Sequence, residues 1–154
     1  MQSIELDALE KLDEDLKDLL EEFPKARREL HERLAEMIKE EVDKQIDASG
    51  LNDSRGKIKG WQEPHVGSGG GYAAVRAQKG ETGDNSPGAI TNYLENGHRI
   101  REPSGKSKYY RPRINKPYVD GYHFYQAART VVEAKAIAEA ERFVEEFRRR
   151  LEGG

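Results

Sequence analysis

The chain has 154 residues, enough for one domain with a modest hydrophobic core. Charged residues make up 36% of the composition and hydrophobic residues 35%, so a compact monomer would be short of core material. The absence of cysteine excludes a disulfide framework and a thiolate metal site. No run of about 20 apolar residues occurs, and the N-terminal segment is acidic, so we expect a soluble, non-secreted protein without a membrane span.

The net charge of −3 is unevenly distributed along the chain. Residues 1–48 hold 16 acidic and 8 basic side chains, whereas residues 49–121 hold 7 acidic and 12 basic ones. This polarity could orient the protein in an assembly, and it could equally reflect solvated helix faces.

Two amphipathic helices are predicted in the N-terminal third. Apolar residues recur every three or four positions from Ile4 to Phe23, and again from Lys25 to Ala48. Pro24 has no backbone N–H and disfavours helical geometry at the residue before it, so we expect the helix to break there. Gly50 is the expected residue after the end of the second helix.

The composition then changes to Gly, Ser, Lys and Asp, which predicts a hairpin. Lys57–Trp61 alternates polar and apolar side chains and predicts a strand. The glycine-rich run Gly67–Gly71 is not followed by the Gly-Lys-Ser/Thr of a phosphate-binding loop, so we expect a hairpin tip. Tyr72–Gln78 is the predicted returning strand.

A short helix is predicted from Pro87 to Gly97, because Ser86 can cap its start and Gly97 can adopt the left-handed conformation at its end. Glu95 and His98 could form an acid–base pair near this end. No third group that would orient them is visible, so we favour a hydrogen bond that fixes the turn.

The following loop is strongly basic. It carries seven basic residues against a single acidic one, Glu102, together with Tyr109, Tyr110 and three prolines that argue against regular structure. Basic residues interleaved with aromatic ones suit single-stranded nucleic acid, and they equally suit an arm that docks on an acidic protein surface. The basic residues, which we expect to bind a partner, are Arg99, Arg101, Lys106, Lys108, Arg111, Arg113 and Lys116.

A final helix of roughly eight turns is predicted from an apolar stripe that runs from Phe124 to Leu151. We expect the core to form from the N-terminal helices, this helix and the strands around Trp61 and Val75. In particular, Leu34 and Phe147 are expected to be buried.

The sequence offers little for catalysis. Its four histidines are scattered, and neither a Ser-His-Asp arrangement nor a metal-ligand spacing is recognisable. We therefore expect no enzyme activity, no catalytic residues, no cofactor and no metal. The histidines are His31, His65, His98 and His123.

Two short motifs and their order resemble a known family. A segment with a tyrosine, a glutamate, a glycine, a histidine and an arginine precedes the basic loop, and a Val-x-Gly-x-x-Phe segment then enters the last helix. The arrangement resembles the tail-completion, or putative tail-component, proteins of long-tailed bacteriophages. The matching residues are Tyr93, Glu95, Asn96, Gly97, His98, Arg99, Val119, Gly121 and Phe124.

The resemblance implies an α+β fold. Its N-terminal helices and long C-terminal helix would pack on a small, mostly antiparallel sheet with long loops, in a single tail-completion-like domain over residues 1–154. The N-terminal helices would occupy residues 1–48, the sheet, short helix and basic loop residues 49–121, and the C-terminal helix residues 122–152. It also implies that Tyr93 and Phe124 are both buried where sheet and helix meet.

The function implied by the resemblance is structural. Such a protein would join the head connector to the tail tube in the neck of the virion, as a homo-oligomeric ring that is a hexamer on the tail, after assembly in the host cytoplasm. Its partners would be itself, the connector or adaptor protein, the tail-tube protein or DNA in the lumen, and no membrane. The alternative is a nucleic-acid-binding protein or a small nuclease that uses the basic loop.

Overall fold

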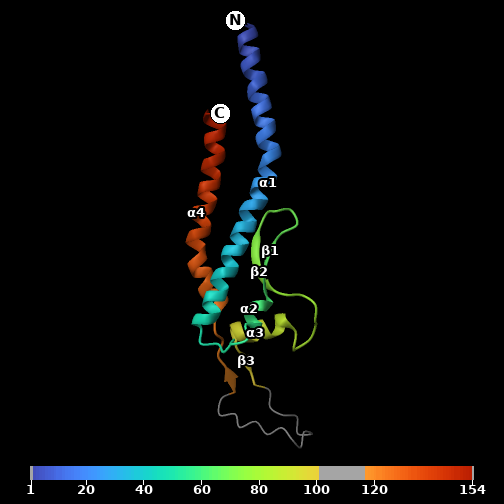
Figure 1. Cartoon of the computed structure of the whole chain (residues 1–154), viewed down its shortest axis with the longest axis vertical. Coiled ribbons are helices and arrows are strands. Elements are labelled where there is room, and N and C mark those ends of the chain that lie inside the picture. Colours follow the sequence, from blue (N-terminus) through green and yellow to red (C-terminus); the bar gives the residue numbers. More distant parts are fainter. Residues whose placement is uncertain (1, 101–116, 154) are drawn as a thin grey trace, which may run out of the picture. The chain divides into compact units, whose positions relative to one another are not determined.

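The computed structural model describes residues 2–100 and 117–153, with the side chains of this part except those of residues 2–13 and 16. Its α+β fold has a long C-terminal helix and two small antiparallel sheets of two strands each, as predicted (Figure 1). The elements in chain order are α1 (Gln2–Ala48), α2 (Lys57–Trp61), β1 (Gln62–Val66), β2 (Ala73–Ala77), α3 (Pro87–Asn96), β3 (His98–Arg99), β4 (Tyr118–Val119) and α4 (Phe124–Gly153).

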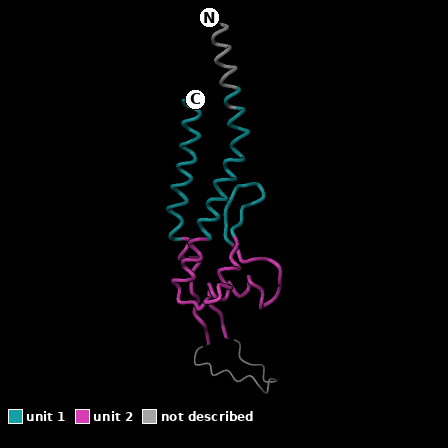
Figure 2. Tube along the Cα trace, viewed as in Figure 1, with its two compact units in different colours: residues 1–39, 64–75, 130–154 teal, residues 40–63, 76–129 magenta. Residues whose placement is uncertain are grey.

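The chain forms two compact units, shown in Figure 2. Unit 1 comprises residues 1–39, 64–75 and 130–154, and unit 2 comprises residues 40–63 and 76–129. Both long helices, α1 and α4, pass from one unit into the other. The single domain expected from the sequence stays a prediction.

The predicted helix break at Pro24 is wrong, because α1 continues through it for 47 residues. A proline inside a helix removes one backbone hydrogen bond and crowds the preceding turn. Packing within unit 1 opposes this cost: the Phe23 ring centroid lies 5.7 Å from that of Phe143 and 5.4 Å from that of Phe147. Tertiary contacts of an amphipathic face therefore hold the helix together where local preference alone would end it.

The predicted strand at Lys57–Trp61 is also wrong, because these residues form the short helix α2. The carboxylate of Asp53 accepts hydrogen bonds of 3.0 Å from the backbone amides of both Ile58 and Lys59, which satisfies donors in the first turn. Alternation over five residues is too short to separate a strand from a helical turn. The strand β1 begins directly afterwards, at Gln62.

The predicted hairpin tip and returning strand are confirmed. The backbone amide of Gly67 donates to the Tyr72 carbonyl at 3.0 Å, and β2 lies within the predicted range. The tip packs on α1 within unit 1, where Arg28 donates to the Ser68 carbonyl at 2.7 Å. Gly70 has a φ of +66°, and a Cβ there would lie 3.1 Å from the Arg28 Cβ, so the glycine allows the close approach.

The predicted short helix is confirmed as α3. The Ser86 hydroxyl accepts a hydrogen bond of 3.2 Å from the Ala89 amide, and Pro87 occupies the first turn, where its missing N–H has no cost. The helix ends at Gly97, which has a φ of +77°.

The long helices supply the buried apolar residues among those described, as predicted, but the strands contribute less than expected. Trp61 and Val75 are only half-buried, and so are Leu34 and Phe147. The buried apolar residues are Leu30, Ala35 and Val132 in unit 1, and Val42, Ile46, Phe124 and Ala128 in unit 2.

Candidate functional site

The two motif segments meet in unit 2 and form a short stem, which we define as residues 98–100 and 117–119. Strands β3 and β4 pair antiparallel, with His98 opposite Val119 and Arg99 opposite Tyr118. The Ile100 amide also donates to the Pro117 carbonyl at 3.0 Å. The stem therefore brings together the two ends of the basic loop, whose residues 101–116 lie outside the described part of the chain.

Glu95 connects the first motif segment to the start of α4. Its carboxylate accepts hydrogen bonds from the backbone amides of Tyr125 at 2.9 Å and Gln126 at 3.1 Å. These amides lie in the first turn of α4, where no carbonyl of the helix can accept them and where the helix dipole favours a negative charge. The buried Glu95 side chain thus caps a helix that begins almost thirty residues later.

The structural role predicted for Glu95 agrees with this geometry, but its partners are backbone amides of α4 instead of His98. The His98 ring lies against the Tyr93 ring, with centroids 5.4 Å apart. The main chain reinforces the connection, because the Leu94 carbonyl accepts from the Tyr122 amide at 2.7 Å and the Glu95 carbonyl from the His123 amide at 3.1 Å.

Gly97 and Gly121 allow the two segments to approach closely. A Cβ at Gly97 would lie 2.3 Å from the Val119 carbonyl oxygen, and a Cβ at Gly121 would lie 2.1 Å from the Glu95 carbonyl oxygen. Neither separation is compatible with a side chain. Both glycines are therefore required by the close contact between the two motif segments.

A buried polar cluster that the sequence did not reveal lies beside this junction. Gln62 is 2% exposed, and its amide nitrogen donates to the Thr91 hydroxyl at 3.2 Å and to the Ile58 carbonyl at 3.1 Å. The Tyr125 hydroxyl donates to the Gln62 side-chain oxygen. Burial, with a smaller contribution from the Glu95 carboxylate, raises the pKa of the Tyr125 hydroxyl to about 12.

The hydrogen bonds of this cluster are all made within unit 2. In the part of the chain that the structure describes, no buried side-chain nitrogen or oxygen lacks a hydrogen-bond partner. A Tyr125 hydroxyl with a raised pKa stays protonated, and thus a donor, over the physiological pH range. No local sequence signal marks Gln62 or Thr91, because their contacts join residues 29 positions apart.

The surface around the stem carries exposed aromatic and apolar side chains, which we call the aromatic rim. It comprises Tyr93, Tyr118, Val119 and Tyr122, which are between 37% and 45% exposed. The prediction that Tyr93 is buried together with Phe124 is therefore wrong for Tyr93, whereas Phe124 is completely buried. Tyr93 contacts the ring of His98, which is itself exposed.

Among the seven basic residues expected to bind a partner, the structure describes Arg99 alone. It is exposed in β3, directly beside the aromatic rim. The other six, Arg101, Lys106, Lys108, Arg111, Arg113 and Lys116, lie outside the described residues.

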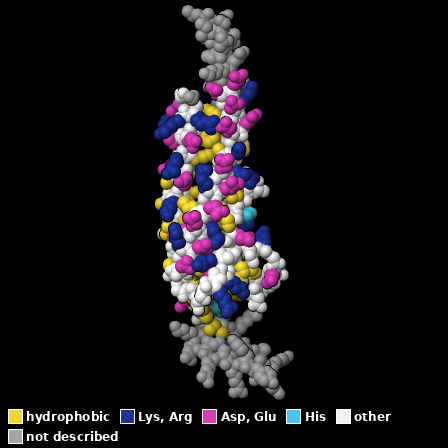
Figure 3. All heavy atoms as spheres, viewed as in Figure 1, with side chains coloured by type: hydrophobic (Ala, Val, Ile, Leu, Met, Phe, Trp, Pro, Cys, Tyr) yellow, Lys and Arg dark blue, Asp and Glu magenta, His cyan; other side chains and the backbone are white. Residues whose placement is uncertain are grey.

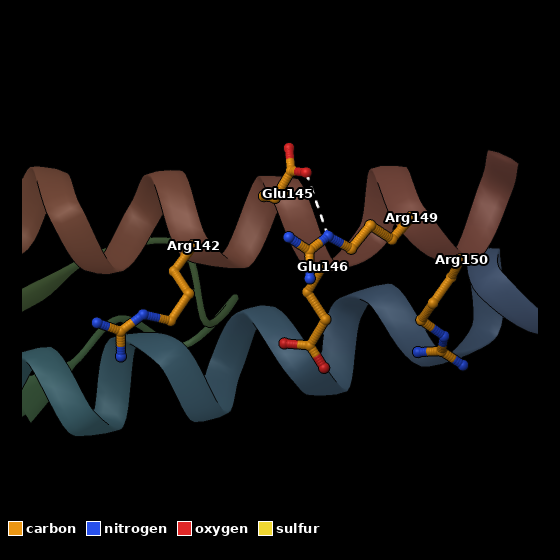
Figure 4. Close-up of a pocket in the computed structure, with 5 residues that line it drawn as sticks. All are labelled: Arg142, Glu145, Glu146, Arg149 and Arg150. Carbon is orange, nitrogen blue, oxygen red and sulfur yellow. Dashed lines mark hydrogen bonds and ion pairs between the residues drawn. The ribbon is translucent and has the colours of Figure 1, made fainter. Parts of the chain in front are cut away.

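A second charged region lies on the C-terminal part of α4. Acidic and basic side chains are interspersed on the face drawn in Figure 3, and a shallow pocket of α4 is shown in Figure 4. Its arginines are already paired: Arg149 with Glu145 at 3.3 Å, Arg142 with Glu139 at 3.2 Å, and Arg150 with Glu22. Balanced, exposed ion pairs of this kind form a solvated helix face and not an anion site.

Neither a metal-binding cluster nor a membrane-spanning helix occurs among the residues that the structure describes. No group of three or more His, Asp or Glu side chains in this part of the chain is placed to hold a metal ion. None of the described helices is both long and apolar enough to cross a membrane.

Comparison with protein-family models, with curated proteins and with solved structures gives no match for this chain.

Proposed function

We propose that this protein is a structural phage virion protein that completes the tail at its head-proximal end and joins it, as a ring, to the head connector. The observation that carries the proposal is the fit between the two motif segments. Glu95 caps α4, and Gly97 and Gly121 permit the backbone contact between them. The residues through which the sequence resembles tail-completion proteins thus act as one structural unit, which supports a shared architecture.

The aromatic rim and the basic loop are the proposed docking surface. Exposed tyrosines and arginines are the side chains most enriched at the centres of protein interfaces, because they combine apolar area with hydrogen-bonding groups. The rim includes Tyr118 and Val119 of the stem, where the basic loop begins and ends, so rim and loop would meet the same partner.

An acidic protein surface is the partner that we favour over DNA. Residues 1–48 carry 16 acidic against 8 basic side chains, and this segment of a neighbouring subunit offers a complementary charge. Tight binding to DNA in the lumen would hinder its passage during ejection. The ring would accordingly be held by contacts between subunits, with the connector on one side and the tail-tube protein on the other.

The test uses a phage in which a nonsense codon in this gene is complemented from a plasmid. Serine replaces four loop arginines: Arg99, Arg101, Arg111 and Arg113. We expect a folded protein that fails to join heads to tails, so that full heads and free tails accumulate in electron micrographs. The charge-matched control replaces four arginines elsewhere, Arg55, Arg129, Arg142 and Arg149, and should yield joined virions.

Two results would contradict parts of the proposal. Joined virions that fail only in DNA retention or delivery would show that the loop faces DNA. Metal-dependent cleavage of plasmid or RNA by the purified protein, or a salt-dependent mobility shift with DNA and no effect on virion assembly, would favour the nuclease or nucleic-acid-binding alternative.

A further inference from the structure

Helix α4 carries an apolar stripe that lies beside the face it packs against α1. Ile137, Val144 and Leu151 are 53%, 64% and 53% exposed. Their spacing of seven residues places them on one side of the helix, almost in line. Phe143 and Phe147, which contact Phe23 of α1, lie on a neighbouring side, so the stripe is separate from the packing within unit 1.

We propose that this stripe pairs two copies of the chain, with α4 packed antiparallel against α4 of the second copy about a two-fold axis near Val144. Ile137 precedes Val144 by seven residues and Leu151 follows it by seven. The axis therefore places Ile137 opposite Leu151 of the second copy, and Val144 opposite itself. A surface that matches itself in this way is what a two-fold contact requires.

Charge complementarity supports a second copy as the occupant and fixes its direction. Glu141 and Arg148 are exposed and follow the same flank of the stripe, three residues before and four residues after Val144. In an antiparallel pair, identical flanks face each other, so Glu141 lies beside Arg148 of the second copy, and this pairing occurs twice. A parallel pair in register would instead set Glu141 level with Glu141 and Arg148 level with Arg148.

The existing contacts of Arg148 leave room for this pairing. Within the same helix, its Nε and Nη2 donate to Glu145 at 2.9 and 2.7 Å, and its Nη1 donates to Glu152 at 3.2 and 3.1 Å. The guanidinium has five N–H donors, so the second hydrogen of Nη2 remains for Glu141 of the second copy. On the opposite flank Ala140 is small and exposed, which lets two helices approach closely. The proposed contact between the two copies therefore needs no rearrangement of α4.

The inference does not depend on the proposed function. It rests on residues of unit 1, whereas the docking surface lies in unit 2. A two-fold contact also differs from the head-to-tail contacts that close a ring, because it uses the same surface on both copies. Failure of one proposal would thus leave the other standing.

The absence of native cysteine allows a direct test by cross-linking, since each introduced thiol is unique in its chain. Under mild oxidation, V144C should form a disulfide-linked dimer by itself. I137C and L151C should each stay monomeric alone and should cross-link when the two are mixed. A138C, exposed on another side of α4, is the matched control and should not cross-link.

Sedimentation equilibrium gives the second readout, with circular dichroism to confirm that each variant stays helical. We expect the wild-type chain to dimerise, and the I137S/V144S double variant to associate at least roughly tenfold more weakly. E141R should weaken dimerisation, because it replaces an attraction to Arg148 of the second copy with a repulsion. A wild-type chain that stays monomeric, or single-cysteine variants at 137 and 151 that cross-link as readily as V144C, would overturn the proposal.

Discussion

The Glu95 carboxylate accepts a hydrogen bond from the Tyr125 amide, 30 residues further along the chain, and so caps the first turn of α4. Replacing Glu95 by alanine leaves the Tyr125 and Gln126 amides without an acceptor. We expect E95A to lower the free energy of unfolding by roughly 1–3 kcal/mol in urea titrations. E95Q, which can still accept one hydrogen bond, should fall between E95A and wild type.

The control for this prediction is E63A, because Glu63 is exposed in β1. Its change should stay within about 0.5 kcal/mol. Equal stabilities for E95A and E63A would contradict the capping role.

Alanine at Gly97 or Gly121 should destabilise the protein. A Cβ at either position would meet a backbone carbonyl oxygen at 2.3 Å or less, and Gly97 also has a positive φ. We expect each variant to lose more than about 1 kcal/mol of stability in thermal or urea unfolding. G88A is the matched control: a Cβ at Gly88 meets nothing within 4 Å inside α3, so this variant should gain up to about 1 kcal/mol. A neutral G121A would show that the two segments are further apart in solution.

The stability of the protein should fall at alkaline pH partly through Tyr125. The pKa of its hydroxyl is raised from 10.0 to about 12 in the folded chain, so the folded state favours the protonated form. This contribution is complete below pH 10 and is lost as the pH rises from 10 towards 12. Unfolding free energies of wild type and Y125F across this range should converge as the pH rises. A constant difference between the two would contradict the raised pKa.

Replacing Pro24 by alanine should stabilise the protein, because α1 continues through this position and the proline costs it a hydrogen bond. The expected gain is roughly 1–3 kcal/mol, with an increase in helical signal by circular dichroism. E21A, an exposed neighbour on the same helix, serves as the control and should change little. Loss of stability in P24A would instead support the helix break at Pro24 that the sequence predicts.

The elements that could be predicted from sequence are those with local causes. Ser86 and Gly97 mark the ends of α3 because a hydroxyl cap and a residue tolerant of positive φ act within a few positions. The incorrect predictions are those in which residues distant in the sequence determine the local structure. Phe143 and Phe147 hold α1 together at Pro24 from more than 100 positions away in the sequence.

The same distinction between local and distant causes applies to the candidate site. The glycines and Glu95 could be selected from the motifs, but the amides that Glu95 binds belong to a helix on the far side of the basic loop. Gln62 gave no sequence signal, since a lone glutamine becomes informative only when Thr91 and Tyr125 lie beside it. The exposure of Tyr93 likewise depends on which side of α3 faces the rest of unit 2.

The hydrogen bond between Ile100 and Pro117 closes the stem before residues 101–116 begin and after they end. The region that carries the stem is held together by Glu95 and by the backbone contacts at Gly97 and Gly121. The sequence of residues 101–116, between the two ends of the stem, is therefore free to change. The entropic cost of closing a loop rises only slowly with its length. Residues 101–116 could therefore be replaced by another sequence while the scaffold that carries the stem stays the same.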